Sequence, residues 1–368
     1  MHLESLTANN FRNIESVTAS LSKDLNVIFG DNAAGKSSFL EAITYLISGR
    51  SFRSSKQTTF STYDSEGFTV FGSFSNADRI GVRFSNGDRV KTVKLNGKLI
   101  KSLAKVANLY PVQTLSPESY HLIDSGPNER RKFLDWLLFH VEHNYQNCWT
   151  SYNRILKQRN ALLKARHSKT KQSELDSWTD PFLTAAAQID NYRNDIASQL
   201  TLALAVVLGD IGFEYADDIK LSYYSGYTGD LSLKLEDSFE RDLASGTTQF
   251  GPHKADFKIK VKGNLVKDVL SRGQKKVLIN SMFLAQTSLL KSKTHKDSLF
   301  IIDDFASELD ESNQLSLVKA LCDQENVQII MSCLQPSMIK ELIKEYNGVK
   351  MFHVERGVIT PHVFHNEN

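Results

Sequence analysis

The chain has 368 residues, 41% of them hydrophobic, and a net charge of +2, which predicts two domains or lobes and gives no overall signal for nucleic-acid binding. The longest apolar run, around residues 202–208, is too short to span a bilayer, and no basic region followed by an apolar one opens the chain. Cys148, Cys322 and Cys333 show no metal or redox spacing, so we expect a cytoplasmic protein without a membrane partner.

A glycine-rich loop is the first predicted functional element. It lies between an apolar strand, residues 26–29, and a segment with helical spacing of apolar residues, 38–47. Residues 30–37 fit G-x-x-x-x-G-K-[ST], in which backbone N–H groups surround phosphates, the lysine reaches the outer phosphates and the serine is a ligand of Mg²⁺. We therefore predict a nucleotide site formed by Gly30, Asp31, Asn32, Ala33, Ala34, Gly35, Lys36, Ser37 and Ser38.

Segments with alternating apolar residues follow at 68–74, 79–84 and 90–95. They predict strands, and the dipeptides Asn86-Gly87 and Asn96-Gly97 predict hairpin turns beside them. From residue 128 to about residue 208 the apolar spacing becomes helical, which indicates a helical lobe inserted into the chain.

After the helical lobe the pattern returns to strands and helices. Strands are predicted at 220–224, 254–261, 298–302, 327–331 and 351–354, and a helix at 272–290. We expect an α/β fold in which a mixed sheet surrounds the glycine loop. The expected boundaries are 1–115 for the first part of this lobe, 116–250 for the mainly helical insertion and 251–368 for the rest.

Two aspartates end the apolar strand at 298–302. A carboxylate at this position is typical of a second oxygen ligand for Mg²⁺, and Asp303 is our candidate. Asp304 is then expected to position or deprotonate the attacking water, as a catalytic residue. The alternative for this pair is a solvated strand end.

The segment LSRGQKK, residues 270–276, opens the predicted helix with a serine and a glycine. Such a start leaves backbone N–H groups and the positive end of the helix dipole available to an anion. The alternative is an ordinary serine N-cap.

A run of positive charge lies in the predicted helical lobe. No acidic residue occurs between Glu142 and Glu174, and this interval contains Arg154, Lys157, Arg159, Lys164, Arg166, Lys169 and Lys171. Several of these side chains are candidates for contacts with nucleic-acid phosphates, whereas a solvated helical face is the alternative.

The order of these motifs resembles that of ABC-type ATPases. The residues within the motifs resemble those of the RecF family, which is related to the heads of SMC proteins. The resemblance covers essentially the whole chain. It rests on NFRNI (10–14), the glycine loop, GRSFRS (49–54), GPNERRKFLDW (126–136), LKQRNALL (156–163), GPHKAD (251–256), LSRGQKK and IDDFASELD (302–310), whose last residues match a D-loop.

This resemblance implies an ATPase head without a long coiled coil, in which ATP and Mg²⁺ lie between two copies of the protein. Ser271 and Gly273 of one copy are then expected to complete the phosphate site of the other. Gln113 lies where the family has its Q-loop and is expected to sense Mg²⁺ or the attacking water, with an edge-strand glutamine as the alternative. Arg12 is expected to reach the nucleotide, with a surface ion pair as the alternative.

Some residues depart from the family pattern. Ala33 and Ala34 replace the glycine or serine of many relatives, but the backbone N–H groups remain. Asp304 replaces a glutamate and is one methylene shorter, which predicts slow hydrolysis. Ser332 stands where transporters have a switch histidine, and it is a candidate for a γ-phosphate contact.

The resemblance implies an ATP-dependent DNA-binding protein of recombinational repair and replication, with weak, DNA-stimulated ATP hydrolysis. ATP is expected to close a homodimer on duplex or gapped DNA, hydrolysis to reopen it, and mediator proteins of the same pathway to be partners in recombinase loading. Arg154, Lys157, Arg159, Lys164 and Arg166 are the candidate DNA contacts. The alternatives are the ATP-binding subunit of an ABC transporter and a P-loop small-molecule kinase.

Overall fold

The computed structural model describes residues 1–54, 56–165, 170–305, 311–335, 346 and 348–362. The chain forms two compact units, one made of residues 1–120 and 271–368 and the other of residues 121–270. The second boundary differs from the expected division at residue 250. Strand β10 (Asp256–Val261) pairs with β9 (Ile219–Tyr224), so residues 251–270 belong to the insertion and not to the first unit.

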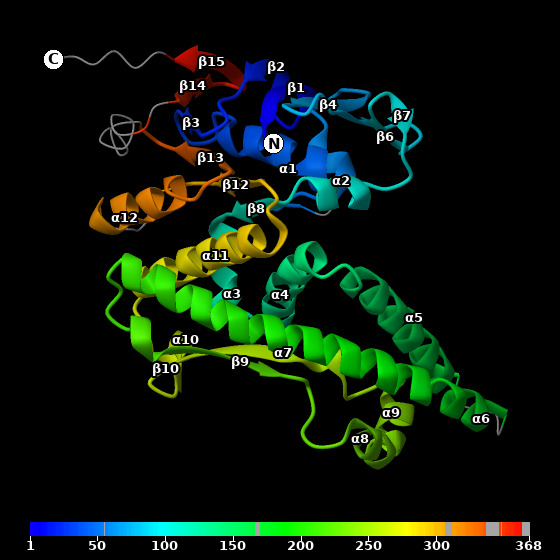
Figure 1. Ribbon diagram of the computed structural model, residues 1–368. Helices are drawn as coiled ribbons and strands as arrows, with labels where there is room; N and C mark the ends of the chain where they lie inside the picture. Colours follow the sequence, from blue (N-terminus) through cyan, green and yellow to red (C-terminus); the bar gives the residue numbers. More distant parts are fainter. Residues whose placement is uncertain (55, 166–169, 306–310, 336–345, 347, 363–368) are drawn as a thin grey trace. The chain divides into compact units, whose positions relative to one another are not determined.

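A largely parallel sheet places the glycine loop in the first unit (Figure 1). Every residue is buried in three of its strands, β3 (Leu25–Phe29), β12 (Ser298–Ile302) and β13 (Val327–Cys333), as expected for parallel strands that are covered on both faces. The strands predicted at 298–302, 327–331 and 351–354 are confirmed. In spatial order the sheet contains β8 (Val112–Leu115), β12 (Ser298–Ile302), β13 (Val327–Cys333), β3 (Leu25–Phe29), β14 (Val349–Glu355) and the antiparallel β15 (Val358–His362).

The second sheet of this unit is antiparallel. Its strands, in spatial order, are β2 (Ile14–Ser20), β1 (Leu3–Phe11), β4 (Gly67–Phe74), β5 (Arg79–Ser85), β6 (Lys91–Leu95) and β7 (Lys98–Leu99). Asn96 and Gly97 form the predicted tight hairpin between β6 and β7, with φ values of 51° and 79°.

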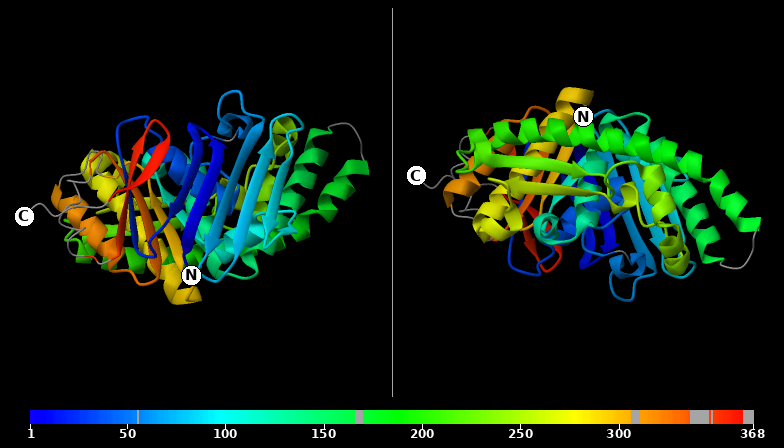
Figure 2. Two further views of the ribbon diagram at one scale, coloured as in Figure 1. Left: turned by 90° about the horizontal axis from the view of Figure 1, so that it is seen from above. Right: turned by 90° about the horizontal axis from the view of Figure 1, so that it is seen from below.

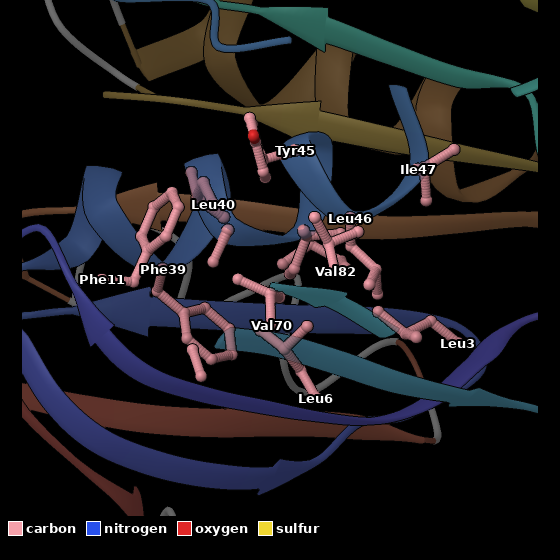
Figure 3. Close-up of a cluster of buried hydrophobic side chains, with 14 of the residues drawn as sticks. Leu3, Leu6, Phe11, Phe39, Leu40, Tyr45, Leu46, Ile47, Val70 and Val82 are labelled. Carbon is pink, nitrogen blue, oxygen red and sulfur yellow. The ribbon is translucent and has the colours of Figure 1, made fainter. Parts of the chain in front are cut away.

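Helix α1 (Lys36–Ser48) lies between the two sheets, and its residues 38–47 are all buried. It contacts β8 and β13 of the parallel sheet and β1, β4 and β5 of the antiparallel sheet. Figure 3 shows the resulting core, with Phe39, Leu40, Tyr45, Leu46 and Ile47 of α1 beside Leu3, Leu6, Phe11, Val70 and Val82. The helix that carries the glycine loop is therefore fixed on both sides by apolar packing.

The remaining helices of the first unit are short or lie against the parallel sheet. They are η1 (Gln57–Phe60), α2 (Ala104–Leu109), η2 (Pro117–Tyr120), α11 (Arg272–Thr294) and α12 (Glu311–Cys322). None of the helices in the described residues combines the length and the apolar composition needed to cross a bilayer.

The second unit is mainly helical, as expected, but it also contains the small sheet β11–β10–β9, with β11 at Asn264–Leu265 (Figures 1 and 2). Its longest helix, α7, has 32 residues. The helices are α3 (His121–Asp124), α4 (Pro127–Val141), α5 (Tyr145–Lys164), α6 (Thr170–Ser177), α7 (Thr179–Asp210), η3 (Ala216–Asp218), α8 (Leu231–Asp237), α9 (Phe239–Ser245), η4 (Pro252–Lys254) and α10 (Val266–Val269).

Two sequence motifs meet inside this unit. Arg193 of α7 donates from Nε and Nη2 to the two carboxylate oxygens of Asp135, at 2.8 and 2.9 Å, and from Nη1 to the carbonyl oxygen of Pro252, at 2.7 Å. Arg131 donates to the carbonyl oxygen of Ala255 at 2.6 Å. The segment GPHKAD is thus held by the buried Arg193 of α7 and by the half-buried Arg131 of GPNERRKFLDW, which gives it a structural role.

Candidate nucleotide-binding site

The glycine loop connects β3 to α1, and its two glycines are required by the backbone. Gly30 has a φ of 149°, and a Cβ atom there would lie 2.2 Å from the carbonyl oxygen of Val354. Gly35 has a φ of 124° and is the N-cap of α1. Both positions lie in the region of φ that side chains disfavour, which explains the spacing of the motif.

The start of α1 has the properties of an anion site. Its N-cap is a glycine, so no side chain caps the helix, and its first turn contains no carboxylate. The first N–H groups of a helix have no partner within the helix, and the dipole is positive at this end. Lys36 is buried and donates from Nζ to the carbonyl oxygens of Gly30 and Asp31, at 2.7 and 2.8 Å. Its ammonium group thus lies over the loop, where a phosphate fits.

Ser37 and Asp303, the pair predicted to share Mg²⁺, lie together beside this loop. The Ser37 hydroxyl donates to Oδ1 of Asp303 at 2.8 Å, although the two residues are 266 positions apart. Desolvation raises the pKa of the Asp303 carboxyl, and hydrogen bonds from Ser37 and Ser332 and the charge of Arg53 oppose that shift. A hydroxyl and a buried carboxylate are suitable oxygen ligands for Mg²⁺.

Asp304 follows directly and differs from Asp303 in its environment. Its side chain is exposed and its φ is 59°, a conformation that aspartate adopts more readily than most residues. Its backbone N–H donates to Oγ of Ser332 at 2.8 Å. The predicted catalytic role of Asp304 stays a prediction, and Ser332 holds both aspartates, which the sequence did not indicate.

Arg12 forms a partly buried ion pair and not the surface pair considered as its alternative. Its guanidinium donates to both carboxylate oxygens of Glu41, at 2.6 and 2.8 Å, and to the carbonyl oxygen of Thr59 at 2.7 Å. Glu41 lies in α1 and its side chain is fully buried. The contact of Arg12 with the nucleotide stays a prediction.

Glu41 is a residue that the sequence analysis missed. It accepts hydrogen bonds from Arg12 and from the hydroxyl of Ser51, so it joins three motifs: NFRNI, α1 and GRSFRS. The sequence signal for Glu41 was a single carboxylate within an otherwise apolar helical segment. A carboxylate that is buried with such a segment needs a positively charged or hydrogen-bonding partner.

The expected role of Gln113 is contradicted. Gln113 is buried in β8, donates from Nε2 to Oε1 of Gln286 at 2.7 Å and accepts a hydrogen bond at 2.5 Å from the hydroxyl of Thr287, both in α11. The next residue, Thr114, lies 3.4 Å from Thr44 of α1 through their hydroxyls. Because neighbouring side chains of a strand point to opposite faces, Gln113 faces away from α1 and cannot sense Mg²⁺ there.

Ser271 is the N-cap of α11 and forms a capping box with Gln274. Its hydroxyl accepts the N–H of Gln274 at 3.3 Å, and its own N–H donates to the Gln274 side chain at 3.0 Å. We expected the N–H groups at the start of this helix to be available to an anion. The N–H groups of Ser271 and Gln274 are taken up by the capping box, so the expectation now applies to those of Arg272 and Gly273 alone. Among the described residues, nothing lies within 4 Å of the place where Gly273 would carry a Cβ atom.

The basic side chains of α5 differ in their exposure to solvent. Arg154, Lys157 and Lys164 are exposed. Arg159 is 4% exposed, donates to the hydroxyl of Thr179 at 2.7 Å and lies over the ring of Phe182, so its expected contact with DNA is contradicted. Arg166 and Lys169, the side chain of Lys171, and the D-loop at 307–310 lie outside the described residues.

The mixed sheet, the glycine loop at the start of α1 and the Ser37–Asp303 pair define a P-loop ATPase head of the ABC type. Residues 2–360 match the model of the RecF/RecN/SMC N terminal domain, and the chain belongs to this family. The predicted family and fold class are confirmed.

Relatives of similar length share about a third of their residues with this chain. The DNA replication and repair protein RecF of Saccharophagus degradans is 35% identical over 366 residues, covering 98% of this chain and 99% of the relative. The protein of the same name from Pseudoalteromonas translucida is 37% identical over 374 residues, covering 97% and 99%.

Solved structures agree with this assignment. The recombination mediator protein RecF, solved with ATP and described as part of the RecFOR pathway, has a TM-score of 0.84 and 27% identity, covering 98% of both chains. An Smc head bound to the C-winged helix domain of ScpA has a TM-score of 0.59 at 15% identity, which shows the shared fold.

Proposed function

We propose that the chain is an ATP-dependent DNA-binding protein of recombinational repair and replication, in which ATP closes a homodimer on DNA and slow hydrolysis reopens it. The observation that carries this proposal is the Ser37–Asp303 pair beside the uncapped start of α1. The relatives support it, because they are named as replication and repair proteins and one of them was solved with ATP. A family match over residues 2–360 gives no support to a transporter subunit or a small-molecule kinase.

The residues of the site have distinct tasks in this proposal. Lys36 and the N–H groups at the start of α1 bind the outer phosphates, and Ser37 and Asp303 hold Mg²⁺. Mg²⁺, when bound, supplies charge neutralisation at the phosphate oxygens. The exposed carboxylate of Asp304 positions or deprotonates the attacking water, and its short side chain limits the rate.

The second copy completes the site in this proposal. Ser271 and Gly273 of that copy face the γ-phosphate. The N–H groups of Arg272 and Gly273 donate hydrogen bonds to it, and the positive end of the α11 dipole stabilises its negative charge. The open space around Gly273 allows close approach by another molecule. DNA contacts, including those of the exposed Arg154, Lys157 and Lys164, stimulate weak hydrolysis, and mediator proteins of the pathway dock on the DNA-bound dimer.

Self-association measured by analytical ultracentrifugation, with and without ATP and Mg²⁺, tests the dimer. We expect ATP to produce dimers of the native chain and of Ser292→Arg, which adds the same charge to an exposed position near the other end of α11. Ser271→Arg should stay monomeric while it binds ATP normally, and Lys36→Ala should lose ATP binding. A native chain that stays monomeric with ATP, or equal hydrolysis by monomeric Ser271→Arg, would contradict the proposal.

A further inference from the structure

One face of the small sheet in the second unit is open and basic. The face that packs on α4 and α7 carries Ile219, Leu221, Phe257, Ile259 and Val261, all buried. Because side chains alternate along a strand, the residues between them point the other way. Of these residues, Lys220, Ser222, Tyr224 and Lys258 are exposed, and Asp256 and Lys260 are half-buried. Figure 2 (right) shows β9 and β10 running side by side along α7.

The placement of the lysines is unfavourable for the isolated sheet. Lys220 and Lys260 are direct register partners on this face, and Lys258 lies two residues before Lys260. Like charges that lie directly opposite each other on neighbouring strands destabilise a sheet, whereas opposite charges stabilise it. Lys220, Lys258 and Lys260 thus form a positive ladder. This ladder is better explained by an anionic partner than by the stability of the fold.

The carboxylates at the two ends of the ladder already have partners. Asp256 accepts from Nε of Arg130 at 2.8 Å, and Asp218 lies 3.5 Å from Nζ of Lys262, which follows β10. Neither carboxylate is available to neutralise Lys220, Lys258 and Lys260. A concentrated positive charge thus remains on the open face.

Aromatic rings lie among these lysines. Nζ of Lys258 lies 5.4 Å from the centre of the Tyr224 ring, and that tyrosine is 39% exposed. Nζ of Lys262 lies 5.3 Å from the centre of the Tyr215 ring. Tyr215 is half-buried, so Tyr224 is the exposed ring beside the ladder, and lysines beside an exposed aromatic ring are typical of surfaces that follow a nucleic-acid backbone.

We infer that this open sheet face binds the phosphate backbone of DNA through Lys220, Lys258 and Lys260, with Tyr224 at the end of the ladder. Lys258 and Lys260 are two residues apart on β10 and therefore about 6.6 Å apart, and Lys220 lies opposite Lys260 on β9, so the ladder is a compact group of three charges. Charges held at this fixed spacing suit a polymer with regularly spaced phosphates better than they suit an acidic protein segment. Contacts of this kind carry no base sequence information. The inference rests on the proposed function, for which it names a DNA-contacting surface.

Binding of fluorescein-labelled duplex and gapped DNA, followed by anisotropy over a range of salt concentrations, tests the inference. In the variant Lys220→Gln/Lys258→Gln/Lys260→Gln we expect affinity at about 0.1 M salt to fall roughly tenfold or more, and the slope of log K against log salt to become shallower by about 2 to 3. Arginine at the same three positions should restore both values.

A control variant changes the net charge by the same amount elsewhere: Lys101→Gln/Lys105→Gln/Lys293→Gln, at exposed positions of the first unit. It should retain the native affinity and slope. All three tryptophans lie in the second unit, so their fluorescence checks that the sheet variant is folded.

The outcomes separate this inference from the proposed function. A native chain that binds no DNA would contradict the proposed function. If the native chain binds DNA and the sheet variant keeps both its affinity and its slope, the inference alone is overturned, and an acidic protein becomes the better partner for this face. A loss equal to that of the control variant would also overturn it.

Discussion

Ser332 holds Asp303 and Asp304 with one hydroxyl group. Its Oγ donates to Oδ1 of Asp303 at 2.9 Å and accepts the backbone N–H of Asp304 at 2.8 Å. The same oxygen of Asp303 accepts the hydroxyl of Ser37 at 2.8 Å. Ser332 is completely buried in β13, so no water replaces it without rearrangement of the sheet. It is therefore a positioning residue for the carboxylate of Asp303 and for the backbone of Asp304.

The variant Ser332→Ala should hydrolyse ATP about tenfold more slowly, with little change in KM, because a lost hydrogen bond of roughly 1 to 1.5 kcal/mol no longer fixes the Asp303 carboxylate and the Asp304 backbone. Steady-state phosphate release measures this. Ser281→Ala is the matched control, since Ser281 is equally buried but its hydroxyl donates to the carbonyl oxygen of Val277 in its own helix. Equal kcat values in the two variants would show that Ser332 has no positioning role.

Ala33 has a φ of 62°, a left-handed conformation that costs an alanine about 1 kcal/mol or more. Glycine adopts this conformation without that cost, so Ala33→Gly should raise the free energy of unfolding by about 0.5 to 1 kcal/mol. Urea unfolding followed by circular dichroism measures the change. Ala34 is not among the residues with positive φ, and Ala34→Gly should instead lower stability by about 1 kcal/mol. Equal shifts in both variants would contradict the argument.

The sequence determined the loop and its neighbours well because short-range rules act there. Gly30 and Gly35 are dictated by backbone conformation, and the strands at 298–302 and 327–331 are uninterrupted apolar runs. The meeting of Ser37 with Asp303 followed from the edge at which parallel strands end.

Which way a side chain faces was harder to predict. Gln113 lies in a strand that is covered on both sides, so its polarity did not reveal which face it occupies. Arg159 is different, because it shares a helical stripe with Tyr152, Ile155 and Leu163, all buried. Its spacing from those residues predicts burial, whereas charge alone suggested exposure.

The register between β9 and β10 could not be predicted from the sequence pattern either. Alternation predicts which residues of each strand share a face, but pairing of Lys220 with Lys260 depends on how the two strands align, and the segment between them spans residues 225–255. The charge ladder was therefore visible only in the structure.

Arg193 and Asp135 form the most buried ion pair among the described residues, with side chains 4% and 12% exposed. Arg193→Met should lower the free energy of unfolding of the second unit by about 3 to 5 kcal/mol, because it leaves a carboxylate and the carbonyl of Pro252 without this donor. Tryptophan fluorescence during urea unfolding reports on this unit.

The control for Arg193 is Lys132→Met, which removes a cation from the exposed pair with Glu129 and should change stability by less than about 0.5 kcal/mol. A cost for Arg193→Met no greater than that of Lys132→Met would show that the buried pair does not stabilise the unit.

His253 should make the second unit sensitive to acid. Its Nε2 lies 2.8 Å from the carbonyl oxygen of Thr248 and must donate to it, so Nδ1 accepts the Tyr152 hydroxyl at 2.6 Å. Burial lowers the pKa of His253 from 6.5 to about 4, and the folded state therefore favours the neutral ring. The unfolded chain binds a proton first, so the stability due to His253 is full above about pH 6.5 and is lost as pH falls toward 4.

Between pH 7 and pH 4.5 this histidine should account for a loss of about 2 kcal/mol in the free energy of unfolding. Urea unfolding followed by tryptophan fluorescence at both pH values measures the loss in the native chain. His253→Gln keeps an amide N–H for the Thr248 carbonyl but does not titrate, so the pH dependence should be weaker by that amount, because the other titrating groups are common to both proteins. An identical pH dependence in the two proteins would mean that His253 is protonated in the folded state as readily as in the unfolded chain, contrary to the cost expected from its burial.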